Sequence, residues 1–181
     1  MKKILAIVGS LRKNSWNRQV AEAVKEILDG QAIVEILDYA EVPMMNEDWE
    51  ANPPAAVSAA REKVAEADGL WFFTPEYNHG IPGVLKNLID WLSRPLPNGD
   101  RAVILGKKAA VSGATIGSGG TLVAQDLLVM TLSILNLDIM NQPRTAISNV
   151  TEQSEDGKLK LAASKAFLEQ QAKSFLKFLD K

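Results

Sequence analysis

A run of hydrogen-bond donors near the start of the chain is the first candidate for chemistry. Residues 9–17 supply two hydroxyls, an amide and a guanidinium, from Ser10, Ser15, Asn17 and Arg12. A helix is expected to follow, and the first N–H groups of a helix point outward and favour an anion. Ser15 alone would be an ordinary N-cap, but a cap does not account for the other donors. The segment therefore predicts a phosphate-binding loop.

Two well-known nucleotide fingerprints are absent from this loop. It lacks the G-x-x-x-x-G-K-[ST] pattern of nucleoside-triphosphate loops, and it does not match G-x-G-x-x-G. A nucleoside-triphosphate site is therefore excluded, and a dinucleotide fold is disfavoured.

A second polar stretch, residues 74–87, follows a short aromatic run that predicts a buried strand. Pro75 and Pro82 stiffen this stretch, while Gly80 and Gly83 permit backbone geometry that other residues resist. Loops at the carboxyl ends of strands are where open α/β sheets bind ligands. The stretch predicts a preformed rim for a flat ligand, and the alternative is an ordinary strand-to-helix connection.

Length and composition favour one globular domain spanning residues 1–181, with 46% hydrophobic and 23% charged residues. The net charge of −2 gives no electrostatic reason to expect nucleic acid or an anionic membrane as a partner. The chain has no cysteine, which excludes disulfides, thiol catalysis and thiolate metal sites, and its one histidine cannot form a His-rich metal cluster.

No stretch approaches the roughly 20 apolar residues of a membrane-spanning helix. The apolar run at residues 4–8 is shorter than the roughly 7–15 residues of a signal-peptide core. A cytoplasmic protein is therefore expected.

Apolar runs and helical stripes alternate along the chain. The expected strands cover residues 3–8, 32–37, 70–73, 108–112 and 138–141. The expected helices cover residues 16–28, 55–67, 121–137 and 161–179, with a further helix ending near Ser93. This alternation predicts an α/β fold, a flavodoxin-like doubly wound five-stranded parallel sheet in the order 2-1-3-4-5. In that order the loops after the first, third and fourth strands converge at one edge.

The expected helix over residues 121–137 is apolar nearly all the way round. A helix of this kind is covered on several sides, either by the core or by a partner subunit.

Three segments carry a resemblance to a known family. They are residues 9–17, the Pro75-Glu76-Tyr77-Asn78 motif, and residues 82–93, which read Pro-Gly-Val-Leu-Lys-Asn-Leu-Ile-Asp-Trp-Leu-Ser. Together they resemble the NADPH-dependent FMN reductase family, and within it the bacterial chromate- and quinone-reducing flavoproteins. The resemblance implies a flavodoxin-like fold, bound FMN, a reduced nicotinamide donor and a homodimer or homotetramer.

The resemblance also implies site residues. The FMN phosphate would lie in the first loop, against Ser10, Arg12, Ser15 and Asn17, and Trp16 of the same loop would also contact the cofactor. The isoalloxazine ring would be bordered by Pro75, Glu76, Tyr77 and Asn78, with its pyrimidine side at Ser112 and Gly113. The third loop departs from the family pattern. Relatives often read Gly-Gly-Ala-Arg where this chain has Gly119-Gly120-Thr121-Leu122 after a longer glycine-rich segment, so an arginine that serves subunit contacts in relatives is missing.

The expected activity is hydride transfer from NADPH, with NADH as a possible donor, through FMN to quinones, free flavin or other small acceptors. Flavin carries this chemistry itself, so no catalytic acid, base or nucleophile is expected from the chain. A ping-pong order is expected, since nicotinamide and acceptor would use the same uncrowded ring face.

Two other functions compete with this interpretation. A flavodoxin-type electron carrier would share the fold and the FMN, although such carriers are usually strongly acidic. A hydrolase using Ser112 or Ser118 is disfavoured, because His79 precedes both serines and no G-x-S-x-G elbow is present.

Two further features stay open. His79 is either a substrate contact or a solvated loop residue. An apolar group after the second strand either lines an entrance above the flavin or anchors its own loop; it comprises Tyr39, Met44, Met45 and Trp49.

Overall fold

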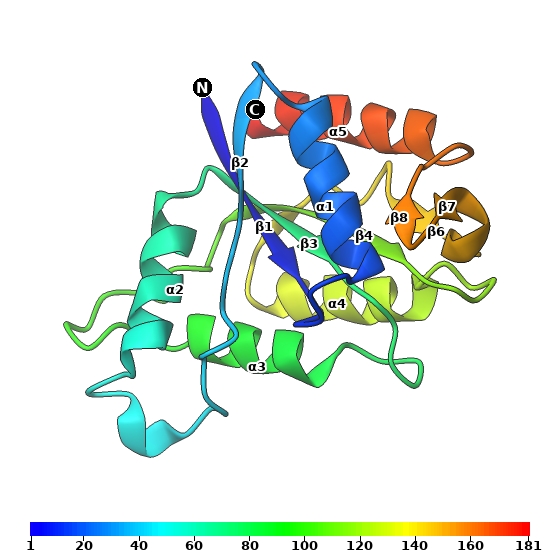
Figure 1. Ribbon diagram of the computed structural model, residues 1–181. Coiled ribbons are helices and arrows are strands. Elements are labelled where there is room, and N and C mark those ends of the chain that lie inside the picture. The colour runs from blue at the N-terminus through cyan, green and yellow to red at the C-terminus, as the bar shows by residue number, and fades with distance from the viewer.

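A computed structural model describes residues 1–181 and contains one central parallel sheet in the order β2-β1-β3-β4-β5 (Figure 1). Its strands are β1 (Lys2–Val8), β2 (Ala32–Ile36), β3 (Gly69–Phe73), β4 (Lys108–Ala114) and β5 (Asp138–Ile139). This arrangement confirms the predicted flavodoxin-like order.

Helices cover both faces of the sheet. They are α1 (Trp16–Ile27), α2 (Ala55–Glu66), α3 (Gly83–Leu92), α4 (Leu122–Ile134) and α5 (Lys165–Leu179). Helices α1 and α5 contribute to one apolar cluster, and α2, α3 and α4 contribute to a second cluster on the opposite face. Figure 1 shows the two groups on either side of the strands.

Strand β3 explains why the sequence shows no alternation between apolar and polar residues. Leu70 and Phe72 enter the cluster under α2, α3 and α4, whereas Trp71 and Phe73 enter the cluster under α1 and α5. All four side chains are fully buried. A strand covered on both faces needs apolar residues at every position, as parallel sheets generally do.

The edge of the sheet beyond β4 differs from the prediction. Instead of one strand over residues 138–141, a short β5 is followed by a second short strand, β6 (Thr145–Ile147), which pairs with Ser112–Ala114. Pro143, which has no N–H to donate to a ladder, lies between the two short strands. Because β6 supplies a partner there, β4 runs two residues beyond its predicted end at residue 112.

The end of the chain also differs in detail. Helix α5 begins at Lys165 rather than at residue 161, and α4 is shorter than the predicted 121–137. The 3₁₀ helix η2 (Val150–Gln153) and a small hairpin of β7 (Ser154–Glu155) and β8 (Lys158–Leu159) precede α5. None of the helices is long and apolar enough to cross a lipid bilayer.

The irregular segment after β2 is fastened to α3. The side chain of Asn87 accepts a hydrogen bond from the N–H of Met45 at 2.7 Å and donates to the carbonyl of Pro43 at 2.9 Å. Trp91 donates its ring N–H to the same carbonyl.

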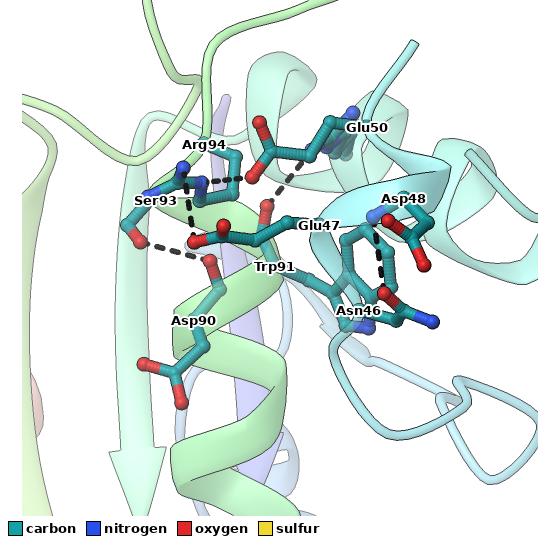
Figure 2. Close-up of polar contacts among 9 residues, drawn as sticks. Asn46, Glu47, Asp48, Glu50, Asp90, Trp91, Ser93 and Arg94 are labelled. Atoms are coloured by element: carbon teal, nitrogen blue, oxygen red, sulfur yellow. Dashed lines mark hydrogen bonds and ion pairs between the residues drawn. The ribbon is translucent and has the colours of Figure 1, made fainter. Parts of the chain in front are cut away.

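Beyond α3, Arg94 pairs with Glu50 and Glu47 of this segment, near the 3₁₀ helix η1 (Glu47–Trp49), as Figure 2 shows. These hydrogen bonds and ion pairs hold the segment after β2 against α3 and Arg94.

Candidate functional site

Three loops lie together at the carboxyl edge of the sheet. They follow β1, β3 and β4, which are adjacent and parallel, so their ends meet. Backbone hydrogen bonds continue the pairing into the loops, from Gly9 N–H to the Phe73 carbonyl at 2.8 Å and from Thr74 N–H to the Ser112 carbonyl at 2.9 Å. The convergence predicted from the strand order is thus present, and Figure 1 shows the loops on one side of the sheet.

The first loop ends at a helix N-terminus that has no side-chain cap. Ser15 takes the N-cap position of α1, yet its hydroxyl makes no capping hydrogen bond, and the first turn carries no acidic residue. Ser15 is buried, whereas Arg12 and Lys13 are exposed and form no ion pair. Free N–H groups beside unpaired cations are the features that bind a phosphate.

Asn17 joins the first loop to the third. Its side-chain oxygen accepts a hydrogen bond from the N–H of Ala114, and its amide nitrogen donates to the Ala114 carbonyl, both at 2.9 Å. The side chain is 2% exposed. Asn17, expected among the phosphate ligands, is therefore a brace between two loops in this structure, and Trp16 beside it packs against the apolar cluster under α1 and α5.

The tip of the second loop is a tight hairpin. Tyr77 and Gly80 exchange backbone hydrogen bonds of 3.3 and 3.0 Å, and Asn78 and His79 between them both have left-handed backbones, with φ of 51° and 57°. Two left-handed residues in succession define the type I′ turn that closes short hairpins. The tip is exposed and projects Tyr77 into solvent at the edge of the site.

Glu76 ties the second loop to α4. One of its carboxylate oxygens accepts a hydrogen bond from the N–H of Ala124 at 3.0 Å, and the other lies 3.0 Å from Nδ1 of His79. Thr121, at the N-cap of α4, makes no capping bond of its own. A carboxylate is stabilised at a helix N-terminus, so Glu76 supplies from another loop the cap that α4 lacks. His79 therefore has a protein partner, although its ring remains largely exposed.

The third loop begins later than the sequence predicted. Ser112 and Gly113 are buried within β4, so neither offers a side chain to a ligand at the surface. The Ser112 hydroxyl accepts from the Trp71 ring N–H at 2.9 Å and donates to Gln171 at 2.8 Å. A Cβ placed on Gly113 would come within 1.9 Å of the Thr121 hydroxyl oxygen.

The part of this loop that reaches solvent is residues 115–119, in which Ile116 is 66% exposed. The place of Ser112 and Gly113 at the ring stays a prediction, and it would involve their backbone, because pairing with β6 extends β4 over both residues. The buried hydroxyl also removes Ser112 as a hydrolytic nucleophile.

Tyr39 is an anchor for its own segment. Its hydroxyl donates to the Val8 carbonyl at 2.6 Å, and its side chain is 6% exposed. Burial raises the pKa of this phenol above its ordinary value, with a smaller contribution from Tyr77. Tyr39 therefore stays neutral and holds the chain after β2 against β1. Met44 and Trp49, in contrast, are exposed on the segment bound to α3.

Comparison with known proteins gives a consistent result. Residues 2–152 match the family described as NADPH-dependent FMN reductase. A 2-hydroxy-1,4-benzoquinone reductase of a Burkholderia species is 37% identical over 147 residues, covering 81% of this chain and 79% of the relative. An NAD(P)H-dependent FMN reductase of Pseudomonas aeruginosa is 42% identical over 149 residues, covering 81% of this chain and 78% of the relative.

Among solved structures, FerB, a flavoenzyme NAD(P)H:(acceptor) oxidoreductase from Paracoccus denitrificans, superposes with a TM-score of 0.89. It shares 29% sequence identity, with 99% of this chain and 98% of that chain covered. The fold, the open helix N-terminus and these relatives agree, and the chain is an enzyme of the NADPH-dependent FMN reductase family.

Proposed function

We propose that this enzyme binds FMN at the three loops and transfers hydride from a reduced nicotinamide nucleotide to small acceptors such as quinones or free flavin. The observation that carries the proposal is the uncapped N-terminus of α1 beside the unpaired Arg12. The N-terminus of α1 can therefore bind a phosphate, and it lies next to the second and third loops, which would border the ring.

The residues present fit FMN. The phosphate would be held by the first N–H groups of α1, by Arg12 and by Ser10, which is half-buried at the start of the first loop. The flat ring would lie between the hairpin tip at Tyr77 and residues 115–119 of the third loop. When bound there, FMN would supply the hydride-accepting and hydride-donating chemistry.

The chain's own task would be position and electrostatics. Pro75 and the Tyr77–Gly80 turn would border the ring, with Asn78 at the turn, and Glu76 and Asn17 would hold the second and third loops in place through Ala124 and Ala114. The surface segment 115–119 carries no charged side chain, and the backbone N–H groups of Ile116, Ser118 and Gly119, which have no acceptor in the protein, would stabilise negative charge developing at the ring.

The relatives support the class of acceptor. One of them is named for a benzoquinone, one for FMN, and others for quinones in general. We infer a ping-pong order, in which the nicotinamide nucleotide leaves the ring face before the acceptor enters it.

Steady-state kinetics of the purified, FMN-loaded enzyme test this proposal. Oxidation of NADPH or NADH should accelerate on addition of a benzoquinone, and reciprocal plots at several acceptor concentrations should be parallel. Intersecting lines would contradict the ping-pong order. Negligible turnover with every quinone and flavin tried, despite bound FMN, would instead indicate a flavodoxin-type electron carrier.

We also propose that the enzyme is a homodimer or homotetramer assembled through α4. The inner face of this helix is buried at Ala124, Leu128 and Leu132. Its outer face exposes large apolar side chains, namely Leu122, Val123, Leu127, Met130 and Ile134. An exposed apolar face of this kind marks an interaction surface.

Light scattering should give at least twice the mass of 19.7 kDa at micromolar concentration. The substitution Ile134→Glu, which puts a charge on the 80% exposed position, should reduce that mass, while Glu22→Ala on α1 should leave it unchanged. A monomer mass for the wild type would contradict the assembly.

A further inference from the structure

A concave site lies beside the first loop, on the side away from β3 and β4, and it shares Ser10 and Arg12 with the proposed site of the flavin phosphate. It is a hollow of about 270 Å³ between the first loop and the residues that follow β2. Its floor is rigid, because the buried Tyr39 is hydrogen-bonded to the Val8 carbonyl at 2.6 Å. We call this feature the basic hollow.

The basic hollow gathers positive charge. Arg12 and Lys13 of the first loop and Arg18 from the first turns of α1 all line it. The three side chains are exposed, and none of them forms an ion pair. The lining contains one carboxylate, Asp38, whose oxygen accepts a hydrogen bond from the N–H of Ala40 within its own turn. Three cations thus face one carboxylate, on a chain whose net charge is −2.

This charge exceeds what the flavin phosphate requires. That phosphate already has the free N–H groups of α1 and the side chains of Ser10 and Arg12 within the proposed flavin site. Lys13 and Arg18 lie beyond that set, on the β2 side of the loop, whereas the ring would extend toward the loops after β3 and β4. A second anionic group, separate from the flavin, fits the unpaired cations.

The proposed reaction supplies such a group. NADPH differs from NADH only by a phosphate on the 2′-oxygen of its adenosine ribose. A nucleotide that stacks its nicotinamide on the flavin ring and follows the ribityl chain would pass the flavin phosphate, because a dinucleotide is longer than a mononucleotide. We place its adenosine end on the far side of the first loop, where Lys13 and Arg18 lie.

We propose that the basic hollow binds the 2′-phosphate of NADPH through Lys13 and Arg18, and that these residues make the enzyme prefer NADPH to NADH. This inference rests on the proposed function, since it assigns a part of the same nucleotide. It adds a specificity site that the flavin-binding residues do not provide.

Calorimetry on the FMN-saturated protein tests the site without turnover. The probes are adenosine 2′,5′-bisphosphate, adenosine 5′-monophosphate and inorganic phosphate, with the flavin phosphate position already filled. The bisphosphate should bind about tenfold or more tightly than the monophosphate, because a dianion gains charge-assisted bonds. Inorganic phosphate should bind weakly, because it lacks the adenosine. Equal binding of all three would reduce the hollow to a general anion site and overturn the proposal.

Two substitutions locate the effect. Lys13→Ala and Arg18→Ala should each remove most of the preference for the bisphosphate, and should lower the NADPH/NADH ratio of kcat/KM by about tenfold. The matched control is Lys25→Ala, an exposed cation in the last turn of α1 that does not line the hollow. A ratio retained in both variants, or lowered equally by Lys25→Ala, would contradict the assignment.

The same variants separate this inference from the proposed function. If Arg18→Ala weakens FMN as strongly as Arg12→Ala does, the hollow belongs to the flavin phosphate and the proposal is wrong. If the wild type oxidises neither nucleotide, the proposed function fails, while calorimetry still decides whether the hollow recognises the 2′-phosphate. If it oxidises both nucleotides with equal efficiency, only the present inference fails.

Discussion

Two helix N-termini meet at the carboxyl edge of the sheet, and they are completed in different ways. At α1 and at α4 the side chain of the N-cap residue, Ser15 or Thr121, makes no capping hydrogen bond to a backbone N–H of the helix. The N-terminus of α4 receives the Glu76 carboxylate from the neighbouring loop, at 3.0 Å from the N–H of Ala124. The N-terminus of α1 receives no carboxylate and has the unpaired Arg12 beside it.

The difference shows how one backbone feature serves two purposes. Both ends carry the same partial positive charge, which an anion stabilises. At α4 the anion is the Glu76 carboxylate of the protein itself, so this helix N-terminus links the second loop to α4. The end of α1 has no acidic residue from the protein beside it, and we propose that the phosphate of FMN binds there.

The largest expected effect concerns the open end. Arg12→Ala should weaken FMN binding on the order of tenfold or more, since a charge-assisted hydrogen bond is worth roughly 1.5–3 kcal/mol. Fluorescence quenching of FMN measures the change, and riboflavin, which has no phosphate, should lose much less affinity in the same variant. Arg101→Ala, which removes another exposed arginine outside the site, serves as the control. An unchanged dissociation constant for FMN would place the phosphate elsewhere.

Loss of the Asn17 hydrogen bonds, which join the first loop to Ala114 at the end of β4, should have the next largest effect. Asn17→Ala leaves the N–H and the carbonyl of Ala114 without their partners in a buried position. Unsatisfied buried groups cost about 1–3 kcal/mol, so Tm should fall by roughly 2–12 °C. Asn14→Ala, at an exposed position in the same loop, controls for the loss of an asparagine. A similar Tm in both variants would show that the Asn17 brace contributes no stability.

The closed end should give the smallest effect. Glu76→Ala removes the cap of α4 at a cost of about 1 kcal/mol, which corresponds to a Tm lower by roughly 2–4 °C. Sulfate should then restore more stability to this variant than to the wild type, because it can take the place of the missing carboxylate. Thermal unfolding with and without sulfate measures both effects. Glu22→Ala, an exposed glutamate on α1, is the control, and an equal sulfate response in it would contradict the capping role.

The architecture was largely readable from the sequence. Continuous apolar runs predicted central strands, because a strand such as β3 must be covered on both faces. The strand order followed from the alternation of strands and helices, which allows few topologies. The donors of the first loop and the Pro75–Asn78 motif were also local features. Their place at one edge of the sheet followed from the order of the strands.

The sequence could not predict which polar side chains are used inside the protein. Asn17 contacts a residue 97 positions away and Glu76 one 48 positions away, and only tertiary packing decides such partners. The sequence did not show that the Ser112 hydroxyl is hydrogen-bonded to Trp71 and Gln171 inside the protein. Nor did it show that pairing with β6 extends β4 past the expected start of the third loop. Local pattern determined the elements and the donor-rich loops of this protein. Long-range hydrogen bonds and strand pairing decided which donors stay free, because a buried polar group must find its partner wherever the fold provides one.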